Sequence, residues 1–307
     1  MEQVNTTVSV YARIESLLSR CLYLLFQLKD EFVYGGYLTS LGCPAFVLSV
    51  SLLLNSAIGW QVLFIAYLIP LIVYSYNYYE ELEKDMATNP ERAEHLRKKV
   101  RLYPALFGLY MSLLIMLLLL YGNYVLTVFV LILLSCGILY TIVFKDLTRQ
   151  VPGFKGIYIA AVWALAGTFI FNFHYSISWD VFSVLMFLFI FLRGIINVTF
   201  FDIKDIESDG ARGLKTLPVL LGREKTYKFL NALNIFSFIP LVAGVYLGII
   251  PVFGLSLLGF YFYDLYYLRK AKFADGQSLR KISYTLADAE FILWPLVLLL
   301  GRTLIHG

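Results

Sequence analysis

The sequence predicts an all-α integral membrane protein with nine transmembrane helices around a central cavity. Hydrophobic residues make up 60% of the 307-residue chain and charged residues only 15%, and the mean hydropathy is +0.74. Apolar runs of about twenty residues recur along the whole length, each long enough to cross roughly 30 Å of hydrocarbon. Basic residues also alternate between loops, which is typical of a chain that crosses a membrane repeatedly.

The elements follow in order as a single domain, residues 1–307. Residues 1–30 are predicted to form a short amphipathic lead-in that lies on the membrane surface, because their leucines fall near helical spacing. No cleavable signal peptide is evident, since this segment is polar or mixed and carries Arg13 and Arg20. Nine apolar runs are then predicted as spans, at about 33–54, 58–79, 102–121, 124–144, 156–173, 179–201, 228–249, 251–268 and 284–302.

The placement of charge predicts how these spans are oriented. Nearly all Lys and Arg beyond the N-terminal segment lie in alternate loops, at 80–101, 145–155, 204–228 and 269–283. The intervening loops carry no Lys or Arg. Arg193 and Arg302 are the only basic residues that fall within predicted spans rather than in these basic loops. By the positive-inside rule, the N-terminus and the basic loops are cytoplasmic and the C-terminus is outside.

A cluster of carboxylates follows the sixth apolar run, in the stretch Asp202–Gly222. Asp202, Asp205 and Asp209 are spaced by three and four residues, so on a continuous helix they would share one face. Gathered carboxylates repel one another, and an all-oxygen cluster suits Mg²⁺ together with substrate phosphates. The alternative is a solvated acidic loop between two membrane helices.

A second acidic stripe ends the second span on the same predicted membrane face. Asn77, Glu81 and Asp85 are spaced by four residues, and the Glu81/Asp85 spacing matches that of Asp205/Asp209. This match suggests an internal pseudo-repeat. Two facing stripes could hold Mg²⁺ ions between them, with a diphosphate bridging the ions. Either stripe alone would be weak evidence for such a site.

These motifs resemble those of the UbiA superfamily of intramembrane prenyltransferases, whose members typically have nine helices and an acidic motif after helices two and six. The first motif here is Asn77-x₃-Glu81-x₃-Asp85, followed by Asn89-Pro90. The second, DIKDIESDGARGLKTLPVLLG, is the more specific. The chain departs from the family where Glu81 replaces Asp and where Tyr78 replaces a second Asp. The family's basic stretch after Pro90 is replaced here by Glu91-Arg92-Ala93-Glu94.

The resemblance implies Mg²⁺-dependent transfer of a prenyl group from a polyprenyl diphosphate to a lipophilic acceptor within the lipid bilayer. The acceptor would be a quinone or aromatic precursor, a tetrapyrrole or a prenylated glycerol phosphate, and no nucleic-acid partner is expected. The metal-binding and catalytic residues would be Asn77, Glu81, Asp85, Asp202, Asp205 and Asp209. Aromatic residues, 17% of the chain, could shield the allylic cation that forms.

Diphosphate-binding cations are expected on the same face. Lys145 follows Tyr140 much as a Lys follows a Tyr in the family, and Lys215 lies in the second motif, so both are favoured over Lys155, Lys204 and Arg212. Arg193 is also a diphosphate-binding candidate, because an intramembrane Arg is expected to face a polar interior. It could equally pair with buried carboxylates; the candidates are Asp264, Asp288 and Glu290, of which the last two are expected near the interface.

Two rival functions remain compatible with the sequence. A terpene cyclase-like enzyme would ionise the same diphosphate without a separate acceptor. A membrane transporter would place its binding groups near the bilayer midplane, whereas these acidic stripes lie at helix ends.

Overall fold

The computed structural model describes residues 19–20, 23, 25 and 27–306. Every regular element in this part of the chain is a helix, in agreement with the predicted fold class. The predicted lead-in, residues 1–30, lies largely outside the described residues.

Seven helical segments of the described chain are long and apolar enough to cross a membrane. They are α4 (Trp60–Glu80); η1 with α7 (Val100–Leu102, Tyr103–Tyr121); α8 (Tyr124–Ile142); α10 (Phe154–His174); α11, η3 and α12 (Val181–Asp202, Ile203–Asp205, Ile206–Ala211); α13 and α14 (Leu217–Phe236, Ile239–Tyr246); and α16, η5 and α17 (Gly276–Ile282, Ser283–Ala287, Asp288–His306).

Two further segments lie at the remaining predicted spans, and neither is among the seven that are long and apolar enough on their own. Helix Gln27–Tyr34 meets Tyr37–Leu53, which contains α2 (Tyr37–Ser40) and α3 (Gly42–Leu53), at a bend of 56°, and this pair makes an eighth candidate if it crosses as one. The predicted span at 251–268 corresponds to η4 (Val252–Leu258) and α15 (Gly259–Lys272).

The seventh span begins earlier than the sequence predicts. The sequence predicts a basic loop at 204–228, yet α13 starts at Leu217 with Pro218 in its first turn, where proline is well tolerated. Gly222 interrupts the helix with φ 74° and ψ 163°, a conformation that glycine adopts readily. The charged residues after Gly222 therefore lie on a helix rather than in a loop.

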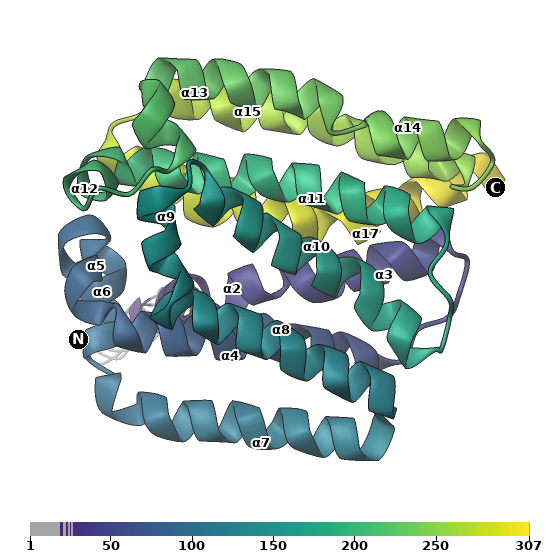
Figure 1. Ribbon diagram of the computed structural model, residues 1–307, viewed down its shortest axis with the longest axis horizontal. Helices are drawn as coiled ribbons and strands as arrows, with labels where there is room; N and C mark the ends of the chain where they lie inside the picture. The colour runs from purple at the N-terminus through teal and green to yellow at the C-terminus, as the bar shows by residue number, and fades with distance from the viewer. Residues whose placement is uncertain (1–18, 21–22, 24, 26, 307) are drawn as a thin grey trace, which may run out of the picture.

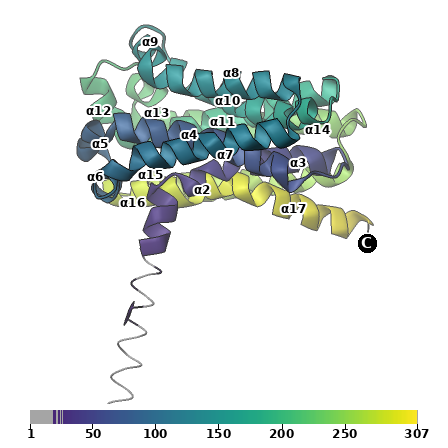
Figure 2. The same ribbon diagram turned by 90° about the horizontal axis from the view of Figure 1, so that it is seen from below.

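The long helices lie side by side, and several of the short ones gather at one end of the bundle (Figure 1). This end carries α12 together with α5 (Leu82–Thr88), α6 (Pro90–Arg97) and α9 (Leu147–Gln150), and the C-terminus lies at the opposite end. The view turned by 90° shows the same separation (Figure 2).

Small residues allow the central helices to approach closely. A Cβ on Gly194 of α11 would lie 3.1 Å from Ala160 Cβ of α10, and a Cβ on Gly167 of α10 would lie 2.7 Å from Phe46 Cβ of α3. Close backbone approach at small residues is a usual basis of helix packing in membranes. These contacts hold α3, α10 and α11 together.

Breaks in two long helices set the position of the acidic motifs. Helix α4 ends at Glu80, and Glu81 separates it from α5. Helix α11 ends at Asp202 and continues through the 3₁₀ turn η3 into α12. The motifs therefore do not follow one continuous helix face, as the spacing argument assumed; each bends around the end of its helix.

Candidate active site

One polar cavity lies where α4 and α11 break. Both acidic motifs line it: Asn77, Glu81, Asp85, Asp202, Asp205 and Asp209 all contribute. The two motifs, which are separated by more than one hundred residues of chain, thus face a common space. The alternative of an isolated acidic loop does not describe this arrangement.

Each carboxylate of the first motif is paired with a base. Arg92 of α6 donates to Asp85 at 2.5 Å, and Lys145 of η2 (Phe144–Asp146) donates to Glu81. Arg92 also lies over the ring of Tyr78, 4.5 Å from its centroid. Burial opposes the charge of Arg92, but the tyrosines around it and Asp85 hold its pKa above the ordinary value, so Arg92 stays cationic.

The second motif is paired in the same way. Asp202 receives a hydrogen bond of 2.5 Å from Lys155 of α10, and Asp205 receives one of 2.7 Å from Lys204. Arg212 donates to Asp209 at 2.9 Å. Five carboxylates and five bases thus form five ion pairs, which compensates charges that would otherwise be costly to bury.

Several oxygens of both motifs remain without partners. Asn77 Oδ1, Asp205 Oδ1 and Asp209 Oδ2 are buried and accept no hydrogen bond in the structure. Buried polar atoms are rarely left unsatisfied unless a ligand, ion or water completes them. Among the described residues, no three His, Cys, Asp or Glu side chains converge into a ready metal site.

Of the three predicted diphosphate-binding bases, Lys145 alone lines this cavity. Lys215 is exposed, and its ammonium lies 3.5 Å from the carbonyl of Gln150. Arg193 is fully buried in a separate cluster, where it donates to Glu290 at 2.5 Å and to Asp264 at 2.7 Å. The structure thus shows the structural pairing of Arg193 that the sequence left open.

The structure also brings residues to the cavity that sequence reasoning passed over or ranked lower. Arg92 stands in the stretch that lacks the family's usual basic residues, and Tyr284 of η5 donates to Asn89 at 2.6 Å. Lys155, ranked below Lys215, lines the cavity.

Asp288 was expected near the interface but is buried at the cavity wall, 6% exposed. The feature of the sequence that indicates this burial is that Asp288 is a carboxylate within an apolar span, where a charged side chain usually faces the protein interior.

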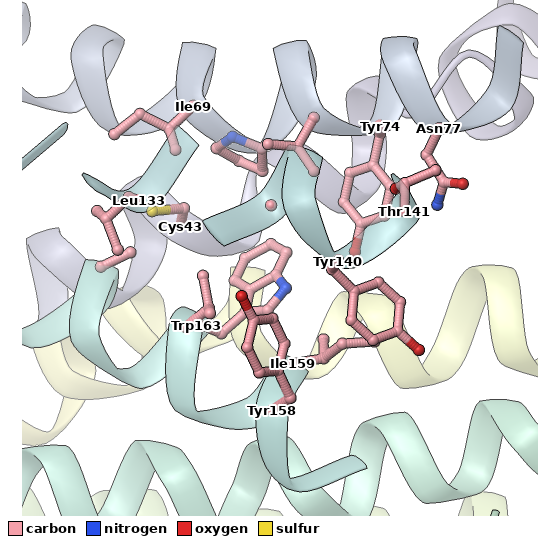
Figure 3. A pocket seen from close by; sticks show the side chains of 15 residues that line it. Cys43, Ile69, Tyr74, Asn77, Leu133, Tyr140, Thr141, Tyr158, Ile159 and Trp163 are labelled. Atoms are coloured by element: carbon pink, nitrogen blue, oxygen red, sulfur yellow. The ribbon is translucent and has the colours of Figure 1, made fainter. Parts of the chain in front are cut away.

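An apolar pocket adjoins the polar cavity (Figure 3). It lies between α4, α8 and α10 and shares Tyr74, Asn77, Tyr140 and Ile159 with the cavity. Aromatic rings form much of its wall, including Trp163 and the stacked pair Tyr140 and Tyr158, whose centroids are 5.4 Å apart. A molecule with a charged head and an apolar tail would find matching surroundings along this axis.

The fold and the site define an integral multi-pass membrane protein with paired acidic motifs above an apolar pocket. The chain belongs to the UbiA prenyltransferase family, whose model matches residues 37–284. A stretch of 119 residues is 33% identical to the digeranylgeranylglyceryl phosphate synthase of Thermococcus kodakarensis, covering 35% of this chain and 41% of that protein. The chain thus matches about two-fifths of that relative's length.

Solved structures share the fold over nearly the whole chain. The apo structure of a UbiA homologue from Aeropyrum pernix K1 superposes with a TM-score of 0.65 at 15% identity, covering 88% of this chain and 98% of that one. A UbiA homologue from Archaeoglobus fulgidus bound to GPP and Mg²⁺ superposes with a TM-score of 0.60 at 15% identity, covering 88% and 99%.

Proposed function

We propose that this protein transfers a geranylgeranyl group from its diphosphate to the free hydroxyl of a geranylgeranylglyceryl phosphate, with Mg²⁺ as cofactor. The observation that carries the proposal is that the cavity lined by both acidic motifs adjoins an aromatic-lined apolar pocket, and Tyr74, Asn77 and Tyr140 line both. The digeranylgeranylglyceryl phosphate synthase similarity supports this acceptor over the quinone, aromatic and tetrapyrrole alternatives.

The residues of the two motifs fit a Mg²⁺ site. Their donors are oxygens, which magnesium prefers, and three of these oxygens are buried without a partner. Asn77, Glu81, Asp85, Asp202, Asp205 and Asp209 would hold the metal. When bound, Mg²⁺ would neutralise the negative charge that develops on the departing diphosphate.

The basic partners of these carboxylates have a second role in this proposal. When the diphosphate enters, the five bases that line the cavity turn from their carboxylates to the diphosphate oxygens. These bases are Arg92, Lys145, Lys155, Lys204 and Arg212. The carboxylates are then free for the metal. The five ion pairs are thus the resting state of a site that keeps its charges balanced before the substrate arrives. We assign no diphosphate contact to Arg193 or Lys215, because neither lines the cavity.

The apolar pocket would hold the prenyl tail and shield the allylic cation. Water that entered would trap the cation as an alcohol, so a closed apolar wall favours transfer over hydrolysis. The aromatic faces of Tyr74, Tyr140 and Trp163 line the pocket next to the polar cavity, where the cation would form. Such faces attract cations electrostatically.

We also propose the full predicted topology of nine spans and its pseudo-repeat. Segment 252–272 would be the eighth span and the bent pair the first. The N-terminus and the acidic motifs would be cytoplasmic and the C-terminus outside, which an odd number of spans requires. In support of the repeat, α4 and α11 each end at an acidic motif and continue into a short helix.

The test is product formation by purified protein in lipid vesicles. Geranylgeranyl diphosphate and geranylgeranylglyceryl phosphate would be supplied with and without Mg²⁺, with aromatic acceptors in parallel. We expect Mg²⁺-dependent diphosphate release coupled to a digeranylgeranyl ether. Release with a cyclic hydrocarbon and no acceptor would support the cyclase-like alternative. The absence of release with every donor and acceptor would overturn the proposal and reopen transport.

A further inference from the structure

Asp288 differs from every other carboxylate of the polar cavity. Six carboxylates line this space, and five of them, those of the two acidic motifs, are ion-paired. Within the described part of the chain, no basic side chain lies within salt-bridge distance of Asp288. Its one recorded hydrogen bond comes from a neutral group, the Thr39 hydroxyl, which donates to Oδ2 at 2.8 Å.

The local backbone directs Asp288 toward the cavity. It is the first residue of α17 and directly follows η5, a π-helical turn that also carries the cavity residue Tyr284. Single π-helical turns are uncommon and occur often at functional sites. The side chain is buried in the protein, yet it belongs to the wall of an open space.

Asp288 also lines a second, smaller apolar pocket. This pocket lies among α3, α10, α11 and α17, with Phe46, Trp163 and Phe291 in its wall. Tyr74, Ile159 and Trp163 are shared with the pocket of Figure 3 and form the partition between the two. Two apolar pockets therefore adjoin the polar cavity, and Asp288 lines both the cavity and the smaller of these pockets.

We propose that Asp288 is the general base of the reaction and accepts the proton of the acceptor hydroxyl. This inference rests on the proposed function. The C1–O bond of the prenyl diphosphate breaks, and its electron pair leaves with the diphosphate. A lone pair of the acceptor oxygen forms the new C–O ether bond with C1. The O–H proton passes to the Asp288 carboxylate and then to solvent, so that one proton is released for each ether formed.

The surroundings favour Asp288 over the other candidates. The five motif carboxylates pair with bases in this structure and would hold the metal once substrate binds. Asp264 and Glu290 are held by Arg193 outside the cavity. The titratable groups facing Asp288 are Tyr74 and Tyr78 of α4 and its own neighbour Tyr284, and phenols are neutral at physiological pH and cannot serve as the resting base.

The test separates proton abstraction from ionisation of the donor. Asp288→Asn would be assayed in vesicles with geranylgeranyl diphosphate, Mg²⁺ and geranylgeranylglyceryl phosphate, following ether product, free geranylgeraniol and diphosphate together. We expect ether formation to fall by about 10²–10⁴-fold, the usual contribution of a general base. Donor binding should stay within about twofold, and the share of diphosphate released with geranylgeraniol should rise. Asp288→Glu should recover part of the ether formation.

Glu290→Gln is the matched control, since it makes the same change two residues away on the same helix. It should lower thermal stability without altering the ratio of ether to geranylgeraniol. An Asp288→Asn enzyme that keeps wild-type ether formation would overturn the inference and leave the departing diphosphate as the base. If Asp288→Asn instead lowers donor binding, hydrolysis and prenyl transfer equally, Asp288 has a structural role and the inference is overturned. If the wild type itself forms no ether, the proposed function fails instead.

Discussion

Lys155 Nζ lies 2.5 Å from Asp202 Oδ1, so the first turn of α10 is joined to the last residue of α11. The aspartate is almost fully buried, and the lysine also lines the cavity. This pair ties the second acidic motif to α10, whose Ile159 and Trp163 line both apolar pockets. It also makes Lys155, rather than Lys215, the base best placed to exchange a carboxylate for a diphosphate.

We therefore expect Lys155→Met to weaken donor binding more than Lys215→Met. Loss of a hydrogen bond to a charged group typically costs about 1.5–3 kcal/mol, which corresponds to roughly tenfold or more in affinity. Binding of geranylgeranyl diphosphate to each variant in detergent with Mg²⁺ would measure the difference. If Lys215→Met has the larger effect, the exposed lysine reaches the diphosphate by a rearrangement absent from this structure.

Asp205→Asn and Asp85→Asn should each reduce turnover by about 10²-fold or more, because each removes a charged oxygen donor from the proposed metal site. Both proteins should remain folded in detergent. Glu207→Gln is the control, since Glu207 lies between Asp205 and Asp209 in the second motif but is exposed and does not line the cavity. Initial rates over a range of Mg²⁺ concentrations would show whether the metal requirement rises. Near-normal activity in either aspartate variant would exclude a two-motif site.

Arg193→Met should destabilise the protein strongly while leaving donor affinity nearly unchanged. The substitution would leave Glu290 and Asp264 buried without their cation, and breaking a buried ion pair in this way costs about 3–5 kcal/mol. Thermal unfolding in detergent would report the loss. A variant of normal stability with much weaker binding of geranylgeranyl diphosphate would instead support the diphosphate contact that the sequence also allowed.

Cys43→Phe should shift donor preference toward shorter chains. Cys43 is buried and lines the apolar pocket at a distance from Asn77, so added volume there would shorten the space for the tail (Figure 3). The measurement is the ratio of kcat/KM for geranylgeranyl diphosphate to that for geranyl diphosphate. Cys136→Phe, which adds the same ring outside this pocket, should leave the ratio unchanged. An unchanged ratio in both would place the prenyl tail elsewhere.

Local patterns were sufficient to predict much of the molecule. Hydropathy placed the long helices because each span must satisfy its own backbone hydrogen bonds in lipid. The spacing of Asn77, Glu81 and Asp85, and of the second motif, indicated two acidic stripes at helix ends, and the structure places both around one cavity. The start of α13 was missed because its second half begins with charged residues, which resemble a loop after a glycine.

Runs and spacings of neighbouring residues were enough to predict an all-helical membrane protein and the residue types of a candidate metal and diphosphate site. Only the tertiary structure decided which bases pair with which carboxylates. It brought Arg92 and Lys155 to the cavity, left Lys215 outside and enclosed Arg193 with Glu290. Among the described carboxylates that line the cavity, it left Asp288 without a basic partner. These relationships depend on where helices break and which faces meet, and residues far apart in the chain carry no local periodicity that could reveal them.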